Sequence, residues 1–317
     1  MLFQQAAMAG FREKVLARRP GILSYGLTPP RAAHDLERLS AIADRQRNQL
    51  RSLPVDGVVL YDLQDESSRD PSPRPFAFLP TLDPFVYARD HLAAGGQELI
   101  VYRAVANHQE AEFAEWLSDA ETGTELAAVT FVGSPTHAAQ PRGRLGLRRA
   151  YQLFAERCRR LLLGGIGIAE RHAEKGDEHR RMLDKQALGC SFFVSQAVYD
   201  LNASRRLLSD LAREAAVREL LPAPVLLTIT PCGSQKAMQF MKWLGISFDP
   251  GIEQRLLQAS DMLAESVAIC EQLILEIASQ QRGPVPLGIN VESVSIRRAD
   301  IEAAVALVEF AHGALRS

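Results

Sequence analysis

The amino-acid sequence predicts an α/β protein with the fold of a (β/α)8 TIM barrel. Eight short runs of apolar and β-branched residues alternate with longer stretches of helical periodicity. No Pro/Ser-rich linker divides the middle of the chain, so residues 1–317 are predicted to form one barrel domain. An open, doubly wound sheet is the alternative, but the glycines that begin at Gly164 lack the G-x-G-x-x-G spacing of its phosphate loop.

The predicted strands are short apolar runs bounded by turn-forming residues or by a helical stretch. This composition is typical of strands that are buried on both faces in a parallel sheet. In chain order they are residues 21–27, 57–61, 98–102, 126–132, 164–168, 191–195, 225–229 and 286–291.

Apolar residues recur at helical spacing between these strands. The predicted helices cover residues 35–50, 109–117, 147–163, 177–188, 205–220, 235–244 and 252–277. The last of these has an apolar face that packs either on the barrel or on a second copy of the chain, so a homo-oligomer stays open.

The charge balance excludes two classes of partner. The chain has 36 basic and 38 acidic residues and a formal net charge of −2, which gives no general attraction to nucleic acid or to an anionic membrane. No apolar run has the roughly 18–20 residues of a membrane-spanning helix. The four cysteines are scattered without C-x-x-C spacing. This pattern is typical of reduced thiols, so a cytoplasmic protein is expected.

One connection between predicted strands is long and rich in proline. It covers about residues 62–97 and contains five prolines between Pro71 and Pro84, together with three phenylalanines. Loops that follow strands surround the active site of a TIM barrel. The segment is therefore either a wall or lid of the site or a packed surface excursion that covers a helix.

Function in a TIM barrel is found at the carboxyl-terminal ends of the strands. The residues at these ends include carboxylates, amides, tyrosines and histidines, a mixture that suits a polar organic ligand and supplies proton donors. Those expected to contact a ligand include Tyr61, Asp62, Tyr102, Gln196 and Glu292.

A metal site would need two or three histidines or carboxylates that converge on one point. His108, His137 and His172 follow different strands and could converge, but no local spacing requires it. A lone histidine is more often a hydrogen-bonded structural residue than a ligand. No metal site is therefore predicted.

Three stretches of the chain carry the pattern of one known family. Leu23-Ser-Tyr-Gly-Leu-Thr-Pro-Pro-Arg31 is similar to that family's first-strand Ser-Phe-Glu-x-x-Pro-Pro-Arg, and Phe131-Val-Gly-Ser-Pro135 to its fourth-strand Leu-Arg-Gly-Asp-x-Pro. Between Gly165 and Gln196 the chain follows the family's fifth strand, a helix with an acidic residue and a lysine, and the Gln at the end of the sixth strand. In this order and over about residues 20–295, the chain resembles the methylenetetrahydrofolate reductases, which are flavin-dependent TIM barrels.

The resemblance implies a site for FAD. His172, Glu178 and Lys185 match positions that hold the adenosine and phosphate portion of the cofactor, where ribose hydroxyls favour a carboxylate and a diphosphate favours a cation. Gly133 matches the glycine that lets the backbone approach the flavin closely. Tyr102 is a further candidate cofactor contact.

The resemblance also implies a site for a folate. Gln196 matches the amide that reads the pterin-like ring, since an amide offers both a donor and an acceptor. Ser134 falls where the family has an Asp, and it can hydrogen-bond but supplies no charge. Tyr61 is the third candidate substrate contact.

The family's proposed general acid has no counterpart at its usual position. That first-strand Glu falls at Gly26, which cannot transfer a proton. In a closed barrel the second and eighth strands flank the first, so Asp62, Asp65, Glu66 or Glu292 could reach the same place. Glu292 and Asp62 are the predicted catalytic residues. Burial would have to raise the pKa of such a carboxyl for it to act as an acid near neutral pH.

The sequence therefore predicts an oxidoreductase that reduces 5,10-methylenetetrahydrofolate to 5-methyltetrahydrofolate with NAD(P)H through bound FAD. Two alternatives stay open: a flavin-free reductase that takes hydride directly from a nicotinamide, and a folate- or flavin-binding barrel that has lost or changed this activity. A lyase or aldolase is disfavoured because no lysine at a strand end is placed to form a Schiff base. No motif distinguishes NADH from NADPH, and a modified pterin is also open as the substrate.

Overall fold

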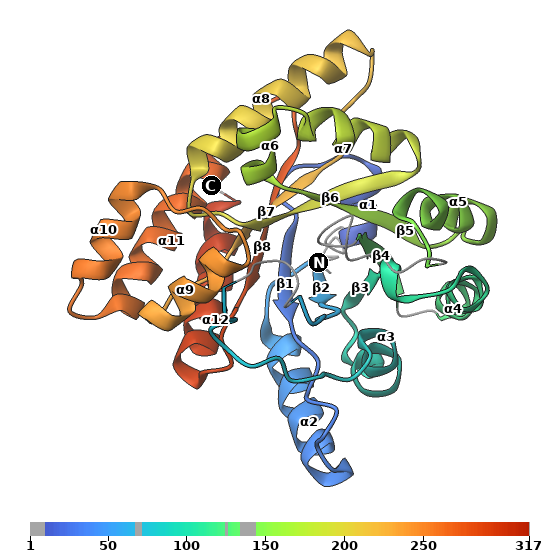
Figure 1. Ribbon diagram of the computed structural model, residues 1–317, viewed down its shortest axis with the longest axis horizontal. Coiled ribbons are helices and arrows are strands. Elements are labelled where there is room, and N and C mark those ends of the chain that lie inside the picture. Colours follow the sequence, from blue (N-terminus) through green and yellow to red (C-terminus); the bar gives the residue numbers. More distant parts are fainter. Residues whose placement is uncertain (1–9, 67–71, 124–125, 134–143, 317) are drawn as a thin grey trace, which may run out of the picture.

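The computed structural model describes residues 10–66, 72–123, 126–133 and 144–316. Its eight parallel strands pair in sequence order and close into a barrel, because β8 pairs with β1 as well as with β7. The strands are β1 Leu23–Leu27, β2 Gly57–Leu60, β3 Glu98–Ala104, β4 Leu126–Val132, β5 Leu162–Gly167, β6 Cys190–Ala197, β7 Val225–Ile229 and β8 Leu287–Glu292. The predicted (β/α)8 TIM barrel and its eight strands are confirmed (Figure 1).

Apolar side chains that alternate along the strands fill the inside of the barrel. Val59, Ile100, Phe192 and Leu226 belong to one buried cluster, as expected for inward positions at every second residue. Helix α1 (Phe11–Leu16) covers the amino-terminal end, where Phe11 meets Phe192 edge-on with 5.1 Å between ring centroids. Because the centre is packed, the inside of the barrel is accessible to a ligand only at its two ends.

Helices surround the strands on the outside (Figure 1). They are α2 Leu36–Ser52, α4 Glu110–Thr122, α5 Leu147–Arg157, α6 Ala169–Lys175, α7 Glu178–Ala187, α8 Leu201–Val217, α9 Gln235–Trp243, α10 Pro250–Gln258, α11 Met262–Ala278 and α12 Arg298–Ala314. Their apolar faces form a second, larger buried cluster with the outward side chains of the strands. The barrel wall is therefore buried on both sides, as in other parallel sheets.

Two of the predicted helices differ from the observed ones. The predicted helix 147–163 ends at Arg157, because Glu121 of α4 accepts the main-chain amides of residues 159–161 at 2.8, 2.5 and 3.1 Å and leads the chain into β5. The predicted helix 252–277 is two helices, α10 and α11, and Asp261 caps the second through the amides at its start. Helices α1, α6 and α12 and the short helix α3 (Pro84–Tyr87) are additional to the predicted set.

The apolar face of α11 packs on the barrel rather than on a second copy of the chain. Ile269, Leu273, Ile274 and Ile277 are all buried, and α11 contacts β7, β8 and α12. The structure therefore shows the first of the two predicted roles of this face, which is to pack on the barrel.

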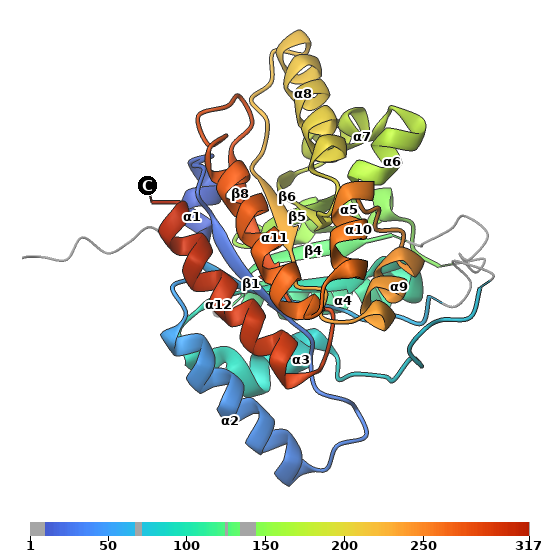
Figure 2. The same cartoon turned by 90° about the vertical axis from the view of Figure 1, so that its left-hand side faces the viewer.

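The proline-rich connection after β2 reaches a helix that follows β7. Residues 72–83, called the strap below, pack against α9: the Phe76 ring meets the edge of Phe240 at 5.4 Å between centroids, and Trp243 Nε1 donates to the Ser72 carbonyl at 3.2 Å. Figure 2 shows α9 at the right-hand end of the molecule and α1 at the left-hand end. The strap therefore crosses the carboxyl-terminal end of the barrel, called the mouth below.

Arg74 adds further contacts between the strap and α9. The Arg74 guanidinium lies 5.2, 5.3 and 5.4 Å from the ring centroids of Phe78, Phe240 and Trp243, respectively. Each contact is a cation–π interaction, and together they enclose the arginine between rings of both segments. After the strap, Asp83 caps the short helix α3 (Pro84–Tyr87).

Among the described residues, no helix combines the length and the hydropathy that crossing a bilayer requires. The four cysteines are free and buried. They form no disulfide framework, as their spacing predicts.

Candidate functional site

The mouth is formed by residues at the carboxyl-terminal ends of the strands. Tyr61 follows β2, Tyr102 ends the inward series of β3, Gln196 lies near the end of β6, and Glu292 is the last residue of β8. Tyr61, Gln196 and Glu292 are half-buried, whereas Tyr102 is buried. Four of the predicted site residues are therefore brought to one end of the barrel.

Glu292 is the carboxyl with the most unusual environment at the mouth. Burial raises its pKa from 4.5 to about 7, and a hydrogen bond from the Tyr61 hydroxyl offsets part of this rise. A carboxyl with a pKa near 7 is protonated often enough to donate a proton at neutral pH. Glu292 therefore has the raised pKa that a carboxyl would need in order to replace the missing first-strand acid.

Gly26 explains why Tyr61 can reach Glu292. In the register between β1 and β8, Gly26 pairs with Glu292. A Cβ built on Gly26 would lie 2.7 Å from Tyr61 Cε2, 2.7 Å from the Tyr61 hydroxyl and 3.1 Å from Glu292 Cβ. Because glycine has no side chain there, the tyrosine ring occupies the space.

A polar layer beneath the mouth fixes the direction of this hydrogen-bond chain. Ser24 Oγ donates to Asn290 Oδ1 at 2.9 Å, and Asn290 Nδ2 donates to the Tyr61 hydroxyl at 2.8 Å and to Thr228 Oγ1 at 3.3 Å. Since the amide orients its nitrogen toward Tyr61, the tyrosine oxygen accepts and its proton points to Glu292. The amide, the phenol and the carboxyl therefore act as one connected unit.

Sequence reasoning did not assign a role to Ser24 or Thr228. Both are buried polar residues at inward positions of apolar strands, and a polar residue at such a position has to be hydrogen-bonded. This break in the apolar alternation is the signal that could have identified them.

The two tyrosines at the mouth pack against each other. The rings of Tyr61 and Tyr102 meet edge-on, with 4.9 Å between centroids and 78° between planes. This geometry is the favourable one for an aromatic pair. It holds the Tyr61 ring in place and gives the mouth an aromatic side next to the carboxyl.

Asp62 does not belong to this unit. Its Oδ2 accepts the main-chain amide of Ala104 at 2.7 Å, and its Oδ1 accepts from Gln64 Nε2 at 2.5 Å. Burial raises the pKa of Asp62, and the Ala104 amide opposes that rise. The carboxylate ties the end of β2 to the end of β3, so its position is that of a structural link.

The remaining predicted folate contacts have different positions. Gln196 Nε2 donates to the Leu244 carbonyl at 3.1 Å, which holds the side chain under the end of α9. Gly133 follows β4, and among the described residues a Cβ on it would meet Leu147, at 3.7 Å. Ser134 lies outside the described residues.

The three residues predicted to hold FAD are engaged in contacts within the helix layer around β5. The buried Glu178 carboxylate accepts from Arg171 Nη1 at 2.9 Å and from the Ile168 amide at 3.3 Å. Lys185 Nζ donates to the Ile166 carbonyl at 2.6 Å, and burial lowers the pKa of this lysine. His172 packs toward α8 and is treated below. Because the Glu178 carboxylate and the Lys185 ammonium group are used in contacts within the protein, these residues do not fit a site for FAD.

Of the three histidines considered as metal ligands, the two that the structure describes face different carboxylates. His108 Nδ1 lies 2.9 Å from Glu112 Oε1 on α4, whereas His172 Nε2 lies 3.0 Å from Asp210 Oδ2 on α8. His137 lies outside the described residues.

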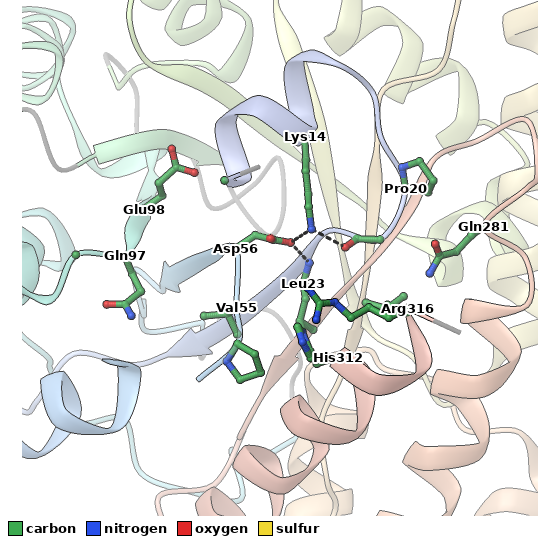
Figure 3. Close-up of a pocket in the computed structure, with 15 residues that line it drawn as sticks. Lys14, Pro20, Leu23, Val55, Asp56, Gln97, Glu98, Gln281, His312 and Arg316 are labelled. Carbon is green, nitrogen blue, oxygen red and sulfur yellow. Dashed lines mark hydrogen bonds and ion pairs between the residues drawn. The ribbon is translucent and has the colours of Figure 1, made fainter. Parts of the chain in front are cut away.

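A cavity of about 590 Å³ lies at the amino-terminal end of the barrel, opposite Glu292. Figure 3 shows Lys14 reaching Asp56 there, with Nζ 2.7 Å from the carboxylate and 3.1 Å from the Gly21 carbonyl. Asp56 also accepts the Leu23 amide at 2.8 Å. These polar groups satisfy one another, and this end of a TIM barrel generally serves stability. We therefore place the candidate site at the mouth.

Comparison with solved structures finds a protein from Clostridium thermocellum, described as uncharacterized, that binds two copies of 5-methyl-5,6,7,8-tetrahydrofolic acid. It is 34% identical, the alignment covers 95% of this chain and 99% of that chain, and the TM-score is 0.82.

More distant matches carry no argument about function. A 2,3-dimethylmalate lyase is 12% identical over 94% of this chain and 93% of its own, with a TM-score of 0.44. Tryptophan synthase from M. tuberculosis is 10% identical over 96% of both chains, with a TM-score of 0.48. No known family profile and no curated protein matches the chain.

Proposed function

The chain belongs to the same family as the 5-methyltetrahydrofolate-binding protein of Clostridium thermocellum, and from this premise we propose that it binds a reduced folate at the mouth of its barrel. The sequence reached the same ligand class through its resemblance to the methylenetetrahydrofolate reductases. Two independent lines thus support a folate, one from motifs and one from a structural relative.

The observation that carries the proposal is the hydrogen-bonded unit of Asn290, Tyr61 and Glu292. A reduced folate presents a pterin with hydrogen-bond acceptors, which include ring nitrogens and the carbonyl oxygen, and with N–H donors. A carboxyl with a pKa of about 7 offers such a ring a proton that an ordinary glutamate has lost at neutral pH. Gln196 Nε2 donates one hydrogen to the Leu244 carbonyl, so the amide would offer a pterin its oxygen as an acceptor and its second hydrogen as a donor.

Isothermal titration calorimetry with 5-methyltetrahydrofolate tests this proposal. We expect Glu292→Ala and Gln196→Ala to weaken binding by about tenfold or more, since each removes a hydrogen bond to the ring. Glu276→Ala on α11 is the matched control, because Glu276 is exposed and paired with Arg205 on α8. The proposal fails if the wild-type protein does not bind the ligand, or if all three variants bind it like wild type.

A second candidate function is supported by the position of Glu292 next to Gly26. It is the reduction of 5,10-methylenetetrahydrofolate to 5-methyltetrahydrofolate with NAD(P)H. In this reaction the bond from the bridging carbon to one folate nitrogen breaks, that nitrogen takes a proton, and the carbon takes a hydride. Glu292 supplies the proton in this proposal, and NAD(P)H supplies the hydride.

Glu178 and Lys185 are held by contacts within the protein and do not fit a site for FAD. The reductase form of the proposal is therefore the flavin-free one, in which the nicotinamide transfers hydride directly to the folate.

Glu292→Gln separates binding from reduction. The amide keeps a hydrogen-bond donor for the ring but cannot transfer a proton. For a reductase we expect oxidation of NADH or NADPH that depends on methylenetetrahydrofolate, and a decrease of about 10²-fold or more in this variant. If neither nicotinamide is oxidised by the wild-type protein, the reductase candidate is wrong and folate binding stands alone.

A further inference from the structure

Three helices on the outside of the barrel bring two histidines and an aspartate together. His172 lies on α6, His179 in the first turn of α7, and Asp210 in the middle of α8. One ligand atom from each of the three lies within 4.8 Å of the others. His172 Nε2 is 3.0 Å from Asp210 Oδ2, and the two imidazole rings meet edge-on at 5.1 Å between centroids.

The two imidazoles are buried and incompletely satisfied. His172 is 6% exposed and His179 is 7% exposed. Nδ1 of each ring is buried without a hydrogen-bond partner among the described residues. Buried polar atoms are nearly always hydrogen-bonded, and an exception indicates a missing water or ion. Nδ1 of His179 is therefore a buried nitrogen open to an ion, whereas His172 faces Asp210 with Nε2, the nitrogen through which it would ligate.

The cluster is separate from the mouth. It lies where α8 packs on α6 and α7, in the helix layer outside β5 and β6. Nothing in the proposed folate chemistry uses these side chains.

We propose that His172, His179 and Asp210 bind a divalent transition-metal ion of the Zn²⁺ class. Imidazole nitrogens together with a carboxylate oxygen suit such ions. Bond lengths of about 2.0–2.2 Å in a tetrahedral site require ligand atoms roughly 3.3 Å apart. His172 and Asp210 already meet this spacing, and the ion takes the place of the proton that they share.

The charges around the cluster are compatible with a cation. Arg213 pairs with the other oxygen of Asp210 at 3.1 Å, but its side chain is 73% exposed and can turn to solvent. Glu214 lies one turn after Asp210 on α8 and acts electrostatically on His179. Arg180 and Arg218 pair with Glu214 at 3.7 and 3.0 Å, so Asp210 supplies the negative charge for the ion, and water can complete the coordination shell.

A metal bound here would link α6, α7 and α8. These helices have no covalent connection other than the chain, so one ion that ligates all three stabilises their packing in the folded state only. The expected consequence is a higher unfolding temperature when Zn²⁺ is present.

Calorimetric titration of the chelator-treated, dialysed protein with Zn²⁺ tests the proposal. We expect one ion per chain, a raised unfolding temperature, and visible absorption from tetrahedral Co²⁺ when cobalt replaces zinc. His179→Gln and Asp210→Asn should each weaken Zn²⁺ binding at least tenfold. Mg²⁺ should bind far more weakly than Zn²⁺, since it prefers oxygen ligands.

We expect Asp210→Asn to fold like wild type, because the change is isosteric and the side chain is 34% exposed. A loss of Zn²⁺ binding in this variant therefore reports on the ligand and not on misfolding. Asp184→Asn on α7 is the matched control, since Asp184 is exposed and pairs with Arg218. The proposal is overturned if the wild-type protein binds no Zn²⁺, or if Asp210→Asn and His179→Gln bind it as tightly as Asp184→Asn does.

Discussion

Glu292 lies directly beside Gly26 in the register that joins β8 to β1. A side chain at position 26 would meet the Tyr61 ring at 2.7 Å and Glu292 Cβ at 3.1 Å. The resemblance to the reductases implies an acid at position 26. The Tyr61 ring occupies this space instead, and the Glu292 carboxyl lies on the neighbouring strand. In the proposed reductase the proton donor is thus a residue of β8 rather than of β1.

The raised pKa of Glu292 predicts how stability depends on pH. Burial raises this pKa from 4.5 to about 7 in the folded chain. The folded protein then holds the proton more tightly than the unfolded chain, so the free energy of unfolding falls as the pH rises from about 4.5 to about 7. At 1.36 kcal/mol per unit, the loss is on the order of 3 kcal/mol.

Glu292→Gln removes this titration. We expect the variant to be more stable than wild type at pH values above about 7 and to show a flatter stability profile below it. Urea unfolding at a series of pH values measures this, with Glu276→Gln as the control. Parallel profiles for wild type and Glu292→Gln would show that Glu292 ionises normally.

Adding a methyl group at position 26 should displace Tyr61. Gly26→Ala places a Cβ at 2.7 Å from the ring, and such overpacking costs about 1–3 kcal/mol of stability. Removing the ring makes room, so the double variant Gly26→Ala/Tyr61→Ala should lose less than the sum of the single losses. Denaturant unfolding of the four proteins in this cycle measures the coupling. Strict additivity would mean that the ring and the added methyl group do not meet.

Tyr61→Phe should move the titration of Glu292 upward. The Tyr61 hydroxyl lowers the pKa of Glu292 by donating to it, so its loss raises that pKa by up to about one unit, the equivalent of one hydrogen bond. Carbon-13 NMR of labelled glutamate carboxyls measures the midpoint. Tyr102→Phe is the control, because it keeps the neighbouring ring and leaves the Tyr61 hydroxyl in place. An unchanged midpoint in Tyr61→Phe argues against the hydrogen bond.

Removing Arg74 should release the strap from α9. Its guanidinium is enclosed by three rings, and the change to alanine is expected to cost about 1–2 kcal/mol. Limited proteolysis should then cut Arg74→Ala within residues 72–83 faster than wild type. Arg298→Ala, at a side chain that is 91% exposed, should not change the rate. Equal cleavage of all three proteins would show that another contact holds the strap.

The strands could be predicted because burial on both faces makes them short apolar runs. All eight were located from this pattern, and their closure into a barrel followed from the alternation with helices. Helix ends were harder, since the end of α5 depends on Glu121, which lies 38 residues before the chain turn at Arg159. A contact that distant leaves no local signal.

The candidate site could be predicted only in part. Glu292 was identified because Gly26 leaves a gap in a recognisable motif, and the neighbouring strands are known once the barrel is assumed. The role of Tyr61 depends on the register of β1, β2 and β8, which the sequence does not state. Glu178 and Lys185 have the residue types of a cofactor site, but only the structure shows that both face the protein.

The most direct test of the central claim is a crystal structure of the protein with 5-methyltetrahydrofolate. The account predicts a pteridine ring at the mouth, within hydrogen-bond distance of the Glu292 carboxyl and beside the Tyr61 ring. Folate bound only at the amino-terminal cavity near Lys14, or at the mouth without contact to Glu292, would contradict it.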